Sequence, residues 1–181
     1  VTVFFSGPFA VALFESQGLG ASLYLDSLSA TMFVLVAFIG VTIIHYTRNY
    51  LDGDQNQERF LKLLSATIAS VMVLVISGNL VLLIAAWITT SLLLNKLLLF
   101  YPDRPTALLA ARKKFVVSRI SELCLIAAAS LLYAQFQTLD IRVILNQVGT
   151  LGTGEATVIA LLLAGAAIFS AAQFPFHGWI L

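Results

Sequence analysis

The side chains that could move a proton are few in this sequence, and they stand near the ends of long apolar runs. Lys96 closes one run, and Arg119 and Glu122 lie three residues apart, on one face of a helix. Ionisable groups inside a membrane are costly and often mark an ion path. We interpret Lys96 and Glu122 as proton-transfer candidates, with Arg119 keeping Glu122 ionised. The alternatives are snorkelling of Lys96 to lipid headgroups and a structural ion pair near the inner surface.

A polar stripe leads up to Lys96. Trp87, Ser91 and Asn95 recur every four residues, so they share one face of a helix. A stripe of this kind either packs against a neighbouring helix or lines a file of water molecules. Asn95 is therefore included among the candidates for an ion path.

The stretch 170–179, SAAQFPFHGW, combines a proline with a histidine at the end of an apolar run. Pro175 must end or kink a helix, which frees backbone carbonyl groups, and His177 follows two residues later. Broken helices of this kind form ion sites in transporters. The alternative is a plain kink with His177 and Trp179 at the membrane interface. Ser170, at the start of the stretch, is a further candidate.

The composition is that of an integral membrane protein. Hydrophobic residues make up 60% of the chain and charged residues only 10%, against about 25% charged residues in soluble proteins. The net charge of +1 gives no reason to expect a nucleic-acid partner. No Walker lysine loop, GxGxxG, CxxC or HExxH pattern occurs. We therefore expect no enzyme active site, no cofactor and no metal site in this chain.

The spacing of charged residues predicts an all-α, polytopic transmembrane bundle. Residues 27–47 carry no charge and are long enough to cross a hydrocarbon core of about 30 Å. Residues 63–95 also carry none, but one helix of that length would measure about 50 Å, so the chain must turn back at 77–79. About five spans are predicted, at 27–47, 60–77, 80–101, 114–134 and 155–174.

Turn-forming residues before the first span predict a short β-like hairpin in residues 1–26, with extended pieces at 1–5 and 22–25. Asp26 is expected to cap the first helix. The chain has no initiator methionine and ends inside an uncharged run. We therefore expect the transmembrane domain, 27–181, to continue in a longer protein.

Basic residues set the expected orientation. With the first span running outside to inside, nine of the ten lysines and arginines face the inner side, and only Arg142 faces the outer side. The hairpin 1–26 would then lie on the outer face. The cluster Arg112, Lys113 and Lys114 is predicted at the N-terminus of the fourth span, where topology or anionic lipid explains it best. A bacterial inner membrane is the expected location.

Four segments resemble one known family. They are 24–32, 59–87, 113–133 and AAQFPFHGW at 171–179. They are similar to segments of the large proton-translocating subunits of respiratory complex I and of multisubunit cation/proton antiporters. The resemblance covers nearly all of the chain from residue 22 onward and implies a cation path through the bundle.

Within that family, residues 86–105 and 111–115 look most like the DabB membrane subunits of two-component inorganic carbon transporters. This resemblance implies a partner, a DabA-like zinc protein similar to β-carbonic anhydrases. Cation flow, expected to be of protons, would drive one-way hydration of CO2 to bicarbonate at that partner. The zinc chemistry would belong to the partner.

The sequence departs from complex I and antiporter members at two positions. Those members carry a glutamate directly after the tryptophan of the third span, where this chain has Ile88, and a lysine where it has Ser170. The two departures argue against an ordinary complex I or antiporter subunit, which remains one alternative. A membrane anchor that holds a soluble enzyme and conducts nothing is the other.

Overall fold

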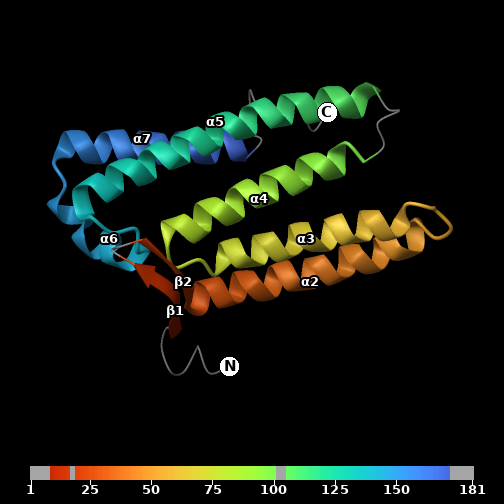
Figure 1. The fold of residues 1–181 in the computed structure, drawn as a ribbon, viewed down its shortest axis with the longest axis horizontal. Helices are drawn as coiled ribbons and strands as arrows, with labels where there is room; N and C mark the ends of the chain where they lie inside the picture. The colour runs from red at the N-terminus through yellow and green to blue at the C-terminus, as the bar shows by residue number, and fades with distance from the viewer. Residues whose placement is uncertain (1–8, 17–18, 101–104, 172–181) are drawn as a thin grey trace.

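The computed structural model describes the chain except for residues 1–8, 17–18, 101–104 and 172–181. An antiparallel hairpin is followed by a bundle of long helices (Figure 1). The elements are β1 Phe9–Ser16, β2 Leu19–Leu25, α2 Ser27–Tyr50, α3 Gln57–Val75, α4 Leu80–Leu98, α5 Pro105–Phe136, α6 Ile141–Gln147, a short 3-10 turn at Val148–Thr150, and α7 Thr153–Ser170.

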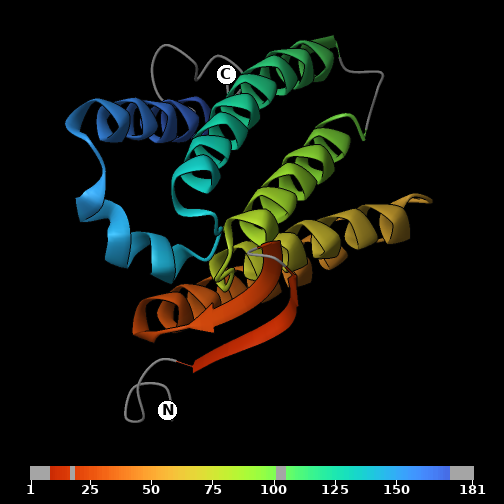
Figure 2. The same ribbon diagram turned by 60° about the vertical axis from the view of Figure 1, so that its left-hand side comes forward.

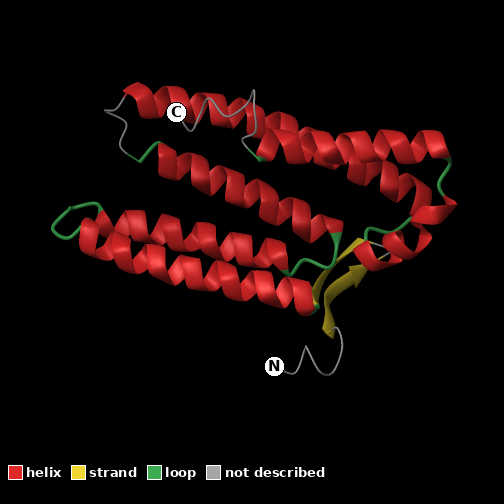
Figure 3. Ribbon diagram, turned by 180° about the vertical axis from the view of Figure 1, so that it is seen from behind, coloured by secondary structure: helices red, strands yellow, loops and turns green. Residues whose placement is uncertain are grey.

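The helices that follow one another in the chain pack side by side, and α7 packs along α5 (Figures 1 and 3). Among the described residues, four helices are long and apolar enough to cross a membrane: Ser27–Tyr50, Leu80–Leu98, Leu108–Phe136 and Thr153–Ser170. The fifth long helix, α3, carries Glu58, Arg59 and Lys62 in its first two turns. The predicted class, a helical membrane bundle with a small N-terminal hairpin, is confirmed.

The structure shows which elements lie together at each end of the bundle. The α2–α3 turn lies at the same end as the end of α4 and the start of α5, whereas the hairpin and α6 lie at the opposite end (Figure 1). Among the described residues, the elements at the first end carry most of the lysines and arginines, whereas Arg142 of α6 lies at the opposite end. We call the first end the inner end and the other the outer end, after the orientation that the basic residues predict.

The helix that contains the predicted fourth span begins earlier than expected. We expected a helix from 114, but α5 begins at Pro105, a residue type that fits the first turn of a helix because its missing N–H has no partner there. Arg112, Lys113 and Lys114 therefore lie in the third turn and not at a helix N-terminus. The sequence YPDRP at 101–105 is typical of a loop, so the first two helical turns of α5 were not predicted.

Of two further expectations, one stays untested and one needs correction. The first strand is Phe9–Ser16, whereas the predicted piece 1–5 lies outside the described residues. The segment between α5 and α7, expected to be a loop, contains α6, and the side chain of Asp140 accepts hydrogen bonds from the backbone N–H groups of Arg142 and Val143 at its start. The sequence of α6 is too short for its periodicity to separate it from a loop.

Asp26 caps α2 as predicted. Its carboxylate accepts a hydrogen bond of 2.7 Å from the backbone N–H of Ser29, and the Ser29 hydroxyl accepts one of 2.8 Å from the backbone N–H of Asp26. This reciprocal arrangement satisfies two N–H groups at the start of the helix. The bond from the Ser29 N–H holds the pKa of Asp26 below its ordinary value.

The backbone of the turn between α3 and α4 forms hydrogen bonds with other segments on both of its sides. On one side, the N–H of Gly78 donates to the carbonyl of Ser22 and the N–H of Tyr24 to that of Ile76, each at 2.8 Å. On the other side, the N–H of Leu80 donates to the carbonyl of Leu139 at 2.9 Å. The predicted break at 77–79 thus joins the hairpin to the segment that leads into α6 (Figure 2).

Gly78 is expected to be essential for this junction, because a Cβ there would lie 2.9 Å from the Ser22 hydroxyl oxygen and 3.0 Å from the Tyr24 Cβ. Gly78→Ala should lower the free energy of unfolding by about 1–3 kcal/mol, the usual cost of overpacking. The thermal unfolding midpoint in detergent measures the loss. Gly149→Ala is the matched control, since its Cβ would meet nothing within 4 Å. Equal midpoints for the two variants would contradict this account.

Candidate functional site

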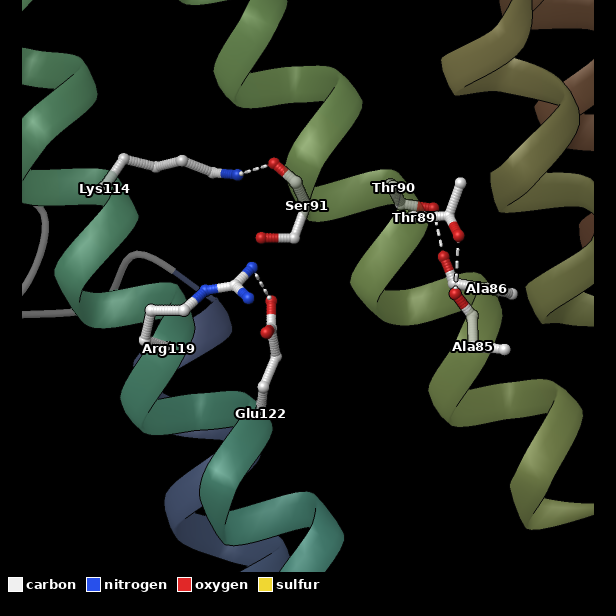
Figure 4. A network of polar contacts seen from close by, with 8 residues as sticks. All are labelled: Ala85, Ala86, Thr89, Thr90, Ser91, Lys114, Arg119 and Glu122. Carbon is white, nitrogen blue, oxygen red and sulfur yellow. Dashed lines mark hydrogen bonds and ion pairs between the residues drawn. The ribbon is translucent and has the colours of Figure 1, made fainter.

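Lys114 is a buried cation in the middle of the bundle. Its residue surface is 6% exposed, and its Nζ donates a hydrogen bond of 2.9 Å to the backbone carbonyl of Ser91 on α4. Figure 4 shows the side chain stretched from α5 toward α4. A lysine is very rarely buried to this extent unless its charge has partners.

An ion pair lies further along the same helix. Arg119 Nη2 is 2.7 Å from Glu122 Oε1, and Glu122 is only 4% exposed. The Arg119 guanidinium also lies over the ring of Phe115, 5.1 Å from its centroid. The predicted Arg119–Glu122 pair is therefore present in the structure. Together with Lys114, the three side chains carry one net positive charge on the face of α5 toward α4 (Figure 4).

A half-open cavity of about 200 Å³, with both polar and apolar groups in its wall, lies beside Lys114. Four helices contribute to its wall. The lining residues are Leu74 of α3, Trp87, Thr90, Ser91 and Leu94 of α4, Lys114, Val117 and Ser118 of α5, and Phe169 and Ser170 of α7. Liquid water occupies about 30 Å³ per molecule, so the cavity has room for several waters. Its hydroxyl groups and the lysine amine are suitable partners for them.

The buried side of α5 explains why these groups meet. Ala111, Lys114, Ser121, Glu122 and Leu125 are buried at the three- and four-residue spacing of one helix face. Within this stripe, the hydroxyl of Ser121 donates a hydrogen bond of 2.7 Å to the carbonyl of Ala166, which fixes α7 against α5. The charged residues are thus held at a packed helix–helix contact.

Hydroxyl groups also fix α4 against α3. The Thr90 hydroxyl donates to the Ser70 hydroxyl at 2.8 Å, and the Ser70 hydroxyl donates to the carbonyl of Ala86 at 3.0 Å. These bonds place the polar side of α4 at a defined rotation. Ser91 consequently faces α5, where Lys114 reaches it.

The structure brings only part of the predicted set together. Ser170 joins the wall of the cavity, whereas Asn95 is not part of it, and the side-chain oxygen of Asn95 is buried with no hydrogen-bond partner among the described residues. Lys96 is exposed in a different hollow with Arg59 and Lys62. Pro175 and His177 lie outside the described residues, so their predicted role at a broken helix stays a prediction.

Lys114 is the residue that reading the sequence missed. Its neighbours Arg112 and Lys113 are exposed, and the whole cluster was interpreted as a topology or lipid signal. The lipid alternative of that interpretation does not fit Lys114, which is 6% exposed and points into the bundle. The signal was available in the spacing of 114, 118, 121 and 122, but it becomes visible only when the helix is extended back toward Pro105.

The arrangement is suited to proton transfer. A primary amine that can hold or release a proton lies beside space for water and near an ionised pair. In the described part of the chain, no group of three histidine, cysteine, aspartate or glutamate side chains is placed to hold a metal ion. Ile88, the other position of departure, lines an apolar groove between α4 and α5 instead of the cavity beside Lys114.

Comparison with known families gives two matches that cover most of the chain. The family described as NADH:quinone oxidoreductase/Mrp antiporter, TM, matches residues 77–181. The family described as NADH-ubiquinone oxidoreductase (complex I), chain 5 N-terminus, matches residues 14–61.

Individual relatives point the same way. The chain is 36% identical to the probable inorganic carbon transporter subunit DabB of Hydrogenovibrio crunogenus, over 94% of its own length and 36% of the relative's. It is 39% identical to the subunit DabB2 of Halothiobacillus neapolitanus, over 90% of its own length and 30% of the relative's. The chain thus spans about a third of these relatives. A solved structure of the Mrp complex from Dietzia matches 98% of the chain and 20% of its own, at a TM-score of 0.86 and 27% identity.

Replacing one member of the Arg119–Glu122 pair should destabilise the protein more than replacing both members. Arg119→Gln leaves a buried carboxylate without its ion-pair partner and should cost about 3–5 kcal/mol, whereas Arg119→Gln/Glu122→Gln leaves no unpaired charge and should cost less. Thermal unfolding midpoints in detergent compare the two. A double variant that is less stable than Arg119→Gln would contradict the pairing.

Proposed function

Because the chain belongs to the NADH:quinone oxidoreductase/Mrp antiporter family of membrane subunits, we propose that it forms part of the proton-conducting subunit of an inorganic carbon uptake complex. Two relatives, 36% and 39% identical, are named as inorganic carbon transporter subunits. A multi-pass membrane protein of a cation/proton family is the general class. The uptake of CO2 as bicarbonate is the specific function proposed here.

The single observation that carries conduction is the buried amine of Lys114 beside a cavity that also holds hydroxyl groups. In the proposed path, water in the cavity exchanges protons with this amine. The carbonyl of Ser91 accepts a hydrogen bond from the protonated amine. A neutral amine also has N–H groups, so it can donate to the same carbonyl. Glu122, paired with Arg119 at 2.7 Å, partly offsets the positive charge of the protonated amine on the same helix.

Lys114 also supplies a cation where the family's lysine is absent. Ser170 occupies the position at which complex I and antiporter members carry that lysine, and Ser170 and Lys114 line the same cavity from α7 and α5. A lysine on the neighbouring helix therefore serves the same space. This placement supports a conducting bundle over an anchor that conducts nothing.

The proposed partner is a DabA-like zinc protein, similar to β-carbonic anhydrases, docked at the basic inner end. Proton flow through this chain would drive one-way hydration of CO2 at the partner's zinc. The support is the similarity to DabB subunits, since this chain contributes no zinc ligand set among its described residues. A subunit of a respiratory NADH dehydrogenase or of an antiporter is the second candidate, because the matched families carry those names.

The first expected outcome concerns energy coupling. Cells that lack carbonic anhydrase and express the full-length protein with its partner should accumulate inorganic carbon, and a protonophore should abolish the accumulation. Accumulation that resists the protonophore but needs sodium would replace the proton by sodium. Absence of accumulation, with NADH dehydrogenase or antiporter subunits co-purifying, would favour the second candidate.

The second expected outcome concerns Lys114. Lys114→Gln should reduce proton-dependent uptake at least about tenfold, because a glutamine amide cannot hold a transferable proton. Loss of a group that transfers protons usually costs about 100-fold or more, so tenfold is a conservative threshold. Arg112→Gln is the matched control. It also removes one positive charge, but from an exposed residue two positions before Lys114. Unchanged uptake in Lys114→Gln, at equal protein in the membrane, would remove this residue from the path.

A further inference from the structure

A second hollow lies at the inner end, between the start of α3 and the end of α4. Its volume is about 600 Å³, and the described residues that line it are Arg59, Lys62, Leu63, Lys96, Leu99 and Phe100. We call it the inner groove. It is separate from the cavity beside Lys114, with which it shares no lining residue.

The groove carries an excess of positive charge. Lys62 pairs with Glu58 at 2.6 Å on the surface of α3. Among the residues that the structure describes, no carboxylate lies within ion-pair distance of Arg59 or Lys96, and both side chains are exposed. The groove therefore has two cations available for a ligand, in addition to the paired Lys62.

The rest of the lining is apolar. Leu63, Leu99 and Phe100 complete the wall, and Phe100 is held by an edge-to-face contact with Phe60, at 5.0 Å between ring centroids. Leu99 is 36% exposed and directly follows α4, a helix that is long and apolar enough to lie in a membrane. Cations and apolar side chains thus meet in one concave surface at the end of two helices of the bundle.

We propose that the inner groove binds an anionic phospholipid, with its phosphate between Arg59 and Lys96 and the start of an acyl chain against Leu99 and Phe100. Basic pockets between membrane helices on the inner side are suited to acidic headgroups. A soluble phosphate would use the cations alone and leave the apolar wall exposed. The groove also gives Lys96 a role other than the proton transfer that its sequence position suggested.

Native mass spectrometry of the full-length protein in detergent tests this site. Titrations with phosphatidylglycerol, phosphatidylcholine and inorganic phosphate separate a lipid site from a simple anion site. The test variant is Arg59→Gln/Lys96→Gln, and the matched control is Arg48→Gln/Arg112→Gln, which removes two exposed cations from the same end but outside the groove. Arg59→Lys/Lys96→Arg keeps both charges and checks that substitution alone does no harm.

Each cation near an anionic lipid surface contributes about 5.4-fold in affinity, so loss of both should weaken phosphatidylglycerol binding roughly 30-fold. The matched control and the charge-keeping variant should bind close to the original affinity. Equal affinity of the test and control variants would overturn the proposal. So would equal binding of phosphatidylcholine, or displacement of the lipid by an equal concentration of inorganic phosphate.

Discussion

The arrangement of the bundle depends on the pairing of the non-helical backbone at 76–80. A break between two membrane helices leaves polar backbone groups that lipid cannot satisfy. Here β2 pairs with one side of the break and residues 139–141 with the other. The hairpin, the start of α4 and the end of α5 consequently meet at one junction. Because these hydrogen bonds fix the start of α4, they also fix the position of Ser91 along α5.

The same physical problem, a polar group in an apolar surrounding, is solved differently in the middle of the bundle. Lys114 uses the carbonyl of Ser91, and Glu122 uses Arg119 on its own helix. The hydroxyls of Ser70, Thr90 and Ser121 use backbone carbonyls within and across helices. Fixed contacts therefore surround the cavity, while the hydroxyls of Ser91, Ser118 and Ser170 and the further N–H groups of Lys114 can still face water.

The sequence was sufficient for the long helices, the break at 77–79, the cap at Asp26 and the Arg119–Glu122 pair, because each depends on local spacing. It was insufficient for Lys114, since the role of a cation near the end of a span depends on where that helix starts and which side is packed. Its two exposed neighbours, Arg112 and Lys113, belong to the same basic cluster. The short helix α6 and the position of β1 were missed because seven or eight residues of mixed character carry little periodicity.

The charged face of α5 has a consequence for how this protein is made. A charged residue at the centre of an isolated span costs about 3 kcal/mol on insertion, and α5 carries Lys114, Arg119 and Glu122 within nine residues. While the ribosome is still producing α7, the carbonyl of Ser91 on α4 is already available to Lys114, but the packing of Ser121 against Ala166 is not. We therefore expect the association of α5 with α4 to assist the entry of α5 into the bilayer.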